Sequence, residues 1–246
     1  MCQQINTKHC KIKVYDYYEQ KKIQLGWLSC KNKCTDLENC SSYKNLGVYI
    51  DEDLNWKAHI DYICGKVTKV CGLFAKLRHC AGFDILKAVY HGLVASHLQY
   101  CNLIWGGANE TTLKPLQTLQ NRIVRIMTYA PFSCENVKQI YDDLELLDLA
   151  QIHKLSKAKF VYKHKNGLLP NNIEDYLCSV EQVHRYRLRS ASNGCYRETC
   201  SNTNASRKMI QYEGAKLWNT IPRSIKIVET LQNFSQIYKI HLLNGN

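Results

Sequence analysis

The sequence predicts a mainly α protein with a small N-terminal antiparallel β-sheet, which is an α+β class. Apolar residues recur at every second position between Lys11 and Ile50, and at every third or fourth position after Leu54. The first spacing is typical of strands and the second of amphipathic helices. The chain has 246 residues, of which 45% are hydrophobic and 4 are Pro, so we expect a packed core rather than a disordered chain.

Three short strands are expected first. Alternating apolar side chains mark them at Ile12 and Val14, at Ile23 to Trp27, and at Leu46 to Ile50. Residues 29–42 are polar and rich in Cys, so this segment is predicted to be a loop. A sheet of this size is too small to stand alone.

Amphipathic helices account for most of the remaining chain. Ala81-Gly82 and Gly106-Gly107 separate the first three. Pro115 suits only a first helical turn, and Asp148 is the expected N-cap of the fifth helix. The predicted helices span residues 56–79, 83–105, about 113–127, 137–144, about 149–165 and 231–240.

This order of elements divides the chain into four parts. We expect a β-hairpin region over 1–56, a helical domain over 57–177, a basic loop or arm over 178–211 and a C-terminal helical segment over 212–246. The arm is assigned by charge, because six Lys or Arg stand against one acid between His184 and Lys208.

The large aromatic residues Tyr100, Trp105 and Trp218 are expected in the core.

Composition also bears on the compartment. The first residues lack the basic start and apolar run of a secretory signal, and no segment approaches the roughly 20 apolar residues of a membrane span. The 13 Cys are odd in number and scattered, unlike the framework of a small secreted fold. We therefore expect an intracellular protein, in the nucleus or cytoplasm, with reduced thiols and no membrane partner.

Two candidate chemistries can be tested against residue spacing. Ile140-Tyr141-Asp142-Asp143 resembles the carboxylate pair of a polymerase, but its apolar phase places both acids on a helix, where a solvated face is the simpler reading. Cys30, Cys34 and Cys40 could bind zinc only if three or four Cys or His converge, and the chain has no Cys-x-x-Cys pair. We therefore expect no catalytic residue, no metal site and no cofactor in this chain.

Positive charge is the remaining signal. The chain has 33 Lys plus Arg against 21 Asp plus Glu, a formal net charge of +12. Charge of one sign on several helices and in the arm is the footprint of phosphate contacts, although surface Lys can also mark only a solvated face. The candidate nucleic-acid contacts on helices and arm are Lys66, Lys69, Lys76, Arg78, Arg122, Arg125, Arg185, Arg187 and Arg189.

Several segments carry a family resemblance. Tyr43 to Asp51, followed by Leu54-Asn55-Trp56 and His59-Ile60, is similar to a Tyr-Leu-Gly-Val-x-Leu-Asp…Leu-x-Trp…His-Ile stretch. Further similar segments are Tyr90 to Tyr100 with Ile104-Trp105-Gly106, Leu116 to Gln120, Arg122 to Ile126, Tyr162 with Leu169-Pro170, Leu217-Trp218-Asn219 with Ile221-Pro222, and Phe234. Over nearly its whole length the chain resembles the C-terminal part of jockey-like reverse transcriptases of non-long-terminal-repeat retrotransposons.

The resemblance implies a function for each part. The polymerase carboxylates and their divalent metal would precede this chain, residues 1–56 would end the palm and form a primer-grip-like hairpin, and the helices would form a thumb-like bundle. Tyr43, Leu46 and Gly47 would then contact nucleic acid. Asn6 to Cys10 departs from the usual Asn-x-x-Lys-Thr, with His9 and Cys10 in the last two places, so a fragment of an element copy is expected.

The resulting expectation is a C-terminal fragment of an RNA-directed DNA polymerase that is not active alone. Its partners would be RNA and DNA as a template-primer duplex, together with the upstream polymerase domain. The alternative is a catalytically inert helical protein-interaction module that retains only the fold. A continuous positive strip on the helices would favour the first interpretation, and evenly mixed charge the second.

Overall fold

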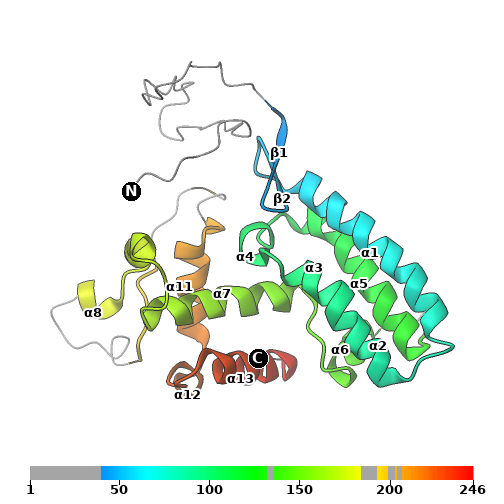
Figure 1. The fold of residues 1–246 in the computed structure, drawn as a ribbon. Coiled ribbons are helices and arrows are strands. Elements are labelled where there is room, and N and C mark those ends of the chain that lie inside the picture. Colours follow the sequence, from blue (N-terminus) through cyan, green and yellow to red (C-terminus); the bar gives the residue numbers. More distant parts are fainter. Residues whose placement is uncertain (1–39, 132–135, 184–192, 199–202, 204–206, 246) are drawn as a thin grey trace. The chain divides into compact units, whose positions relative to one another are not determined.

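The structure is a computed structural model that describes residues 40–131, 136–183, 193–198, 203 and 207–245 (Figure 1). It is mainly helical with a two-stranded antiparallel sheet, which confirms the predicted fold class. The chain divides into two units, Met1–Asp61 and Tyr62–Asn246. The strands predicted at Ile12 to Val14 and Ile23 to Trp27 lie outside the described residues.

The sheet is a tight hairpin. Strand β1 (Ser42–Asn45) pairs with β2 (Val48–Asp51), and Asn45 lies opposite Val48. Only Leu46 and Gly47 are left for the turn, with φ angles of 45° and 87°. Two consecutive positive φ angles define a type I′ turn, which suits the twist of a two-residue hairpin. Gly47 therefore occupies a tight turn position. The prediction of Leu46 as a strand residue is wrong, because the chain reverses there.

Short polar contacts lead from the hairpin into α1 (Lys57–Leu77). The Asp51 carboxylate accepts hydrogen bonds from the backbone N–H groups of Asn55 and Trp56, each at 2.8 Å. The buried His59 accepts one from the Tyr49 N–H at 3.4 Å through Nδ1. These contacts lie within the first unit and fix how the chain enters the helix.

From Tyr62 onward, α1 lies beside α5 (Glu110–Thr128) in the second unit (Figure 1). Arg122 of α5 is close enough to Cys71 of α1 for its charge to oppose the rise that burial causes in the thiol pKa. Seven residues further along the chain in each case, just past the ends of the two helices, the Tyr129 hydroxyl donates a hydrogen bond to the carbonyl oxygen of Arg78. The two contacts follow one another in the same direction, so the two helices run parallel.

The helix predicted over 83–105 is interrupted. It begins as α2 (Phe83–Tyr90), passes through a π-helical turn (His91–Ala95) and ends as α3 (Ser96–Gln99), and α4 (Asn102–Trp105) follows separately. The break falls at Cys101, whose φ angle is 50°. The Trp105 indole N–H donates to the Tyr100 carbonyl oxygen at 2.8 Å across it. Trp105 is buried as predicted, but Tyr100 is 51% exposed, so its predicted place in the core is wrong.

The start of α5 differs from the prediction. The helix begins at Glu110, so Pro115 lies in its second turn and not in its first. Pro115 is exposed, and because it has no N–H it cannot donate the helical hydrogen bond to the Thr111 carbonyl oxygen. Further along α5, the buried Gln120 amide donates to the Tyr90 hydroxyl and to the Leu147 carbonyl oxygen, each at 2.9 Å. These bonds tie α5 to α2 and to the link after α6 (Val137–Asp143).

Helix α7 (Leu149–Lys165) is the central element of the second unit. Asp148 caps it as predicted: its carboxylate accepts from the Gln151 N–H at 2.7 Å, and the Gln151 side chain accepts from the Asp148 N–H at 3.0 Å. Helices α3, α4, α11 (Ile210–Thr220) and α13 (Leu231–Leu243) pack against α7. Shorter elements are a 3₁₀-helix (Asn171–Tyr176), α8 (Val180–Val183) and α12 (Arg223–Lys226).

An aromatic cluster joins α7, α11 and α13. Phe234 stacks on Tyr162 with 4.5 Å between the ring centroids, and lies 5.8 Å from both Trp218 and Tyr238. Trp218 is fully buried, as predicted. Within the predicted basic arm, the described residue Tyr196 is also buried, and its backbone exchanges two hydrogen bonds with the Asn219 amide at 3.0 and 2.9 Å.

Candidate nucleic-acid interface

Three predicted lysines form a strip on the outer side of α1. Lys66, Lys69 and Lys76 are exposed, while Val67 and Phe74 on the other side are buried completely. Lys69 and Lys76 are two helical turns apart and therefore share one side, and Lys66 lies one turn before Lys69. Residues 62–79 contain no Asp or Glu. We call Lys66, Lys69 and Lys76 the α1 lysine strip.

The strip is long enough to follow a nucleic-acid backbone. A rise of about 1.5 Å per residue separates Lys66 from Lys76 by about 15 Å along the helix axis. A duplex presents about four phosphates per strand over that length, at about 3.4 Å of axis each. The ammonium group of Lys66 also lies 5.5 Å from the ring centroid of Tyr62, one turn earlier.

The predicted arginines are not all part of this face. Arg122 is exposed on the side of α5 that meets α1, where its charge reaches Cys71. Arg125 is half-buried and lies close enough to Tyr141 of α6 to lower the phenol pKa, against the larger effect of burial, which raises it. Arg78 is half-buried over the Tyr129 ring. The structure therefore groups Arg122 with α1 and turns Arg78 and Arg125 toward packing contacts.

The remaining predicted contacts fall elsewhere. Tyr43, Leu46 and Gly47 belong to the hairpin of the first unit, where Leu46 is 85% exposed at the tip and Tyr43 is half-buried in β1. Arg185, Arg187 and Arg189 lie outside the described residues, as do Cys30 and Cys34. The contacts expected from the three arginines therefore stay predictions from the sequence, as does any role of the two cysteines.

Asp142 and Asp143 are the last two residues of α6, so both lie on a helix as predicted. Consecutive side chains on a helix point in different directions. Asp143 is exposed and accepts a hydrogen bond from the Gln139 amide at 2.8 Å. Among the residues that the structure describes, no group of three or more His, Cys, Asp or Glu side chains could hold a metal ion. In the same residues, no helix is both long and apolar enough to span a membrane.

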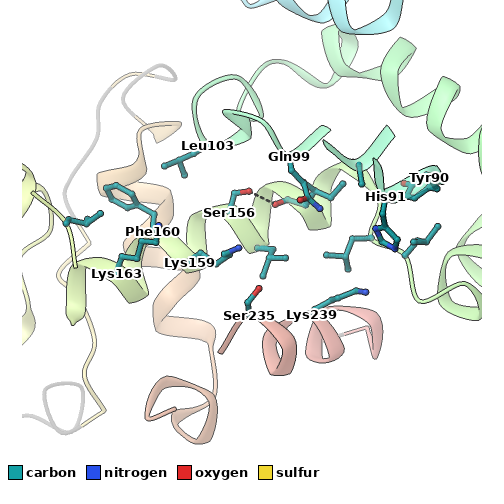
Figure 2. Close-up of a pocket in the computed structure, with 16 residues that line it drawn as sticks. Tyr90, His91, Gln99, Leu103, Ser156, Lys159, Phe160, Lys163, Ser235 and Lys239 are labelled. Carbon is teal, nitrogen blue, oxygen red and sulfur yellow. Dashed lines mark hydrogen bonds between the residues drawn. The ribbon is translucent and has the colours of Figure 1, made fainter. Parts of the chain in front are cut away.

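Sequence reasoning missed a basic cleft in the second unit. The cleft has a volume of about 530 Å³ and lies between one face of α7, α13 and the segment that includes the π-helical turn (Figure 2). Lys159, Lys163 and Lys239 are its cationic lining residues, and none of the described residues that line it is Asp or Glu. We call these three lysines the cleft cations, and His91 lines the cleft beside them.

The cleft cations affect one another. Burial lowers the pKa of Lys159, and the charge of Lys163 lowers it further. Burial also lowers the pKa of Lys239 and of His91, and the Lys239 charge adds to the effect on His91. The sequence signal is weak, because Lys159 and Lys163 stand among several other lysines on one helix and Lys239 is an isolated lysine in an apolar helix.

Comparisons of the chain with known protein families, with curated proteins and with solved structures give no match.

Proposed function

We propose that this chain binds the backbone of an RNA–DNA or double-stranded nucleic acid without reading its sequence. In this proposal it is the C-terminal, thumb-like part of a retrotransposon reverse transcriptase and works with an upstream polymerase domain that supplies the carboxylates and their divalent metal. The resemblance of the sequence motifs supports the family, and the arrangement of charge supports the binding.

The observation that carries the proposal is the α1 lysine strip. Three exposed ammonium groups lie along one side of a helix whose residues 62–77 include no carboxylate that could neutralise them. Arg122 adds a fourth exposed positive charge on the neighbouring helix. Phosphate contacts of this kind hold a duplex in position and carry no information on base sequence. Mixed charge along the same side of α1 would have favoured a protein-interaction module.

The hairpin supplies a second kind of contact in this proposal. Leu46 extends from the type I′ turn with 85% of its surface exposed. In the resembled family the corresponding hairpin grips the primer end, so Leu46 and Gly47 would approach the nucleic acid there. Because the chain contributes no metal-binding carboxylates in this proposal, we expect no nucleotide incorporation by the isolated chain with any template, primer and divalent ion.

The binding is tested by a salt titration with a 20-base-pair RNA–DNA hybrid. A Lys66→Gln, Lys69→Gln, Lys76→Gln triple variant should bind at least tenfold more weakly than the wild type in low salt. The slope of log affinity against log salt should also become shallower by about 2 to 3, because fewer counterions are released. Fluorescence anisotropy of the labelled hybrid measures both quantities.

A matched variant separates position from net charge. Lys138, Lys154 and Lys216 are exposed on α6, α7 and α11, so changing all three to Gln removes the same charge outside the strip. This control should keep most of the wild-type affinity and slope. Equal losses in both triple variants, or no binding by a folded wild-type chain, would contradict the proposal and favour the protein-interaction module.

A further inference from the structure

The basic cleft is built from faces of separate helices. Ile152, Leu155, Ser156, Lys159 and Lys163 recur at three or four residues along α7 and share one side of it. Ser235 and Lys239 are one turn apart on α13. Figure 2 shows the labelled α7 side chains on one side of the cleft and those of α13 on the other.

We propose that this cleft binds a small phosphate ester with an apolar or aromatic body, of the size of a nucleoside monophosphate. The phosphate would lie between Lys159 and Lys239, which approach from facing helices. The body would lie against the apolar part of the lining. The proposal does not depend on the α1 lysine strip, which belongs to another helix.

The positive charges of the cleft favour an anionic ligand. Within the part of the chain that the structure describes, Lys159, Lys163 and Lys239 form no salt bridge. The acid that acts on Lys239 is Glu145, but that carboxylate is 73% exposed and lies 3.5 Å from the Lys87 ammonium group. Cations that share a partly buried cleft repel one another, and burial strengthens the repulsion. A bound dianion between the lysines would offset this repulsion, because each ammonium group would be attracted to it.

A phosphate fits this surplus better than a carboxylate does. Three lysines line the cleft, and a phosphate monoester carries about −1.5 to −2 charges at pH 7 with three strong acceptor oxygens. A carboxylate carries one charge and two oxygens. The cleft also offers Gln99 and Ser235 as donors for oxygen atoms, since neither side chain forms a hydrogen bond among the described residues.

The remaining lining explains why the ligand should have a body. Leu146, Leu147, Leu155 and Phe160 supply apolar surface, and the volume of about 530 Å³ exceeds what an inorganic phosphate needs. Pockets for small organic ligands have volumes of about 300–1,000 Å³ and combine apolar walls with a few polar groups. Phe160 lies at one end of the cleft and Tyr90 and His91 at the other, so an extended ligand can contact an aromatic ring (Figure 2).

Isothermal titration calorimetry of the full chain with adenosine 5′-monophosphate at low salt tests the proposal. We expect saturable binding at one site, with adenosine and inorganic phosphate each at least tenfold weaker because each lacks half of the recognised groups. A Lys159→Gln, Lys239→Gln double variant should weaken binding of the monophosphate at least tenfold. Its thermal midpoint should not fall, because the removed charges repel each other.

Two further variants make the outcome decisive. Ser235→Phe should block the cleft and reduce binding at least tenfold while both lysines remain. Lys138→Gln, Lys154→Gln removes the same charge from exposed positions outside the cleft and should bind within twofold of the wild type. Equal binding by the wild type and the Lys159, Lys239 double variant, or no binding by the folded wild type, would overturn the proposal.

The same experiment distinguishes two sources of the phosphate. A 5′-phosphorylated tetranucleotide that binds as well as the monophosphate, with loss in the double variant, would identify the end of a strand as the ligand. Binding of the monophosphate alone would identify a free small molecule. The α1 triple variant should retain this binding even where it loses the duplex, so failure of one proposal leaves the other testable.

Discussion

The guanidinium of Arg78 lies over the ring of Tyr129, with its central carbon 3.6 Å from the ring centroid. The Tyr129 hydroxyl donates to the Arg78 carbonyl oxygen, and His79 meets the same ring edge-on with 6.2 Å between the centroids. Arg78 follows the last residue of α1, and Tyr129 follows the last residue of α5. One aromatic ring therefore joins the ends of two parallel helices, one of which carries the α1 lysine strip.

Removing that ring should loosen the helix pair. We expect Tyr129→Ala to lower the free energy of unfolding by about 1–3 kcal/mol, since a cation–π contact contributes about 0.5–2 kcal/mol and a hydrogen bond about 1 kcal/mol. Tyr129→Phe should lose only the hydrogen-bond part. Urea unfolding of both variants measures the difference. Strictly additive effects of Tyr129→Ala and Arg78→Ala in the double variant would show that the two side chains do not interact.

Gly106 lies where no side chain fits. A Cβ atom added there would approach the backbone oxygen of Asn102 to 2.5 Å and its side-chain oxygen to 2.6 Å, and would also meet His153. Overpacking of this kind costs about 1–3 kcal/mol, and we expect Gly106→Ala to reach the upper part of that range because backbone is involved. Thermal unfolding followed by circular dichroism measures the loss.

Gly72 provides the matched control for that substitution. It is exposed on α1 and has no atom within 4 Å of an added Cβ. Gly72→Ala should therefore stabilise the chain by about 0.5–1 kcal/mol, through the helix preference of Ala alone. A Gly106→Ala chain that gains stability in the same way would contradict the close packing around His153.

His153 should make the chain sensitive to acid. Burial, with a smaller effect of Lys157, lowers its pKa from 6.5 to about 4, and Nδ1 lies 3.1 Å from the Asn102 side-chain oxygen. The unfolded chain binds a proton at His153 more tightly than the folded chain does. The contribution of neutral His153 to the free energy of unfolding is therefore fully present above pH 6.5 and is lost as the pH falls toward 4. The loss should reach about 3 kcal/mol, at about 1.4 kcal/mol per unit of pKa.

Unfolding free energies at several pH values between 7 and 4 test this effect. His153→Gln keeps an amide that can bond to Asn102 and has no titrating group, so its stability should depend less on pH in that interval. A wild type and a variant with parallel pH profiles would show that His153 does not carry the acid sensitivity.

Local signals predicted much of this fold. Helix α7 matches its prediction at both ends, because Asp148 caps it through neighbouring groups and its apolar spacing is regular. The break at Cys101 was missed, since neither Gly nor Pro marks it and a Trp105 side chain closes it. The α5 start was missed because Pro115, which usually marks a first turn, is tolerated here at an exposed position.

The candidate sites also differ in how far the sequence predicts them. The exposure of the α1 lysine strip follows from helical spacing on a single element, so sequence was sufficient. The partial burial of Arg78 depends on Tyr129, which is 51 residues away. The cleft brings together Lys159 and Lys239 from two helices, and no local pattern in either one indicates the other. Contacts between distant elements are therefore what the sequence alone did not supply.

The hairpin turn should be intolerant of a branched residue at Gly47. Its φ angle of 87° lies in a region that β-branched residues avoid. We expect Gly47→Val to destabilise the turn by about 1–3 kcal/mol and to weaken binding of the RNA–DNA hybrid as a consequence. Amide hydrogen exchange of β1 and β2 measures the first effect. Unchanged protection in both strands, with unchanged binding, would contradict the assignment of the turn.

Leu46 separates the stability of the turn from its function. Its φ angle of 45° is one that Asn adopts more readily than Leu, and Asn-Gly is the preferred pair in a type I′ turn. Leu46→Asn should therefore leave the hairpin as stable as in the wild type or more so. If the exposed leucine contacts nucleic acid as we propose, the same change should weaken binding of the hybrid several-fold, at constant salt slope because no charge is removed. Anisotropy and hydrogen exchange on one preparation measure both effects, and a stable variant with wild-type affinity would remove Leu46 from the proposed interface.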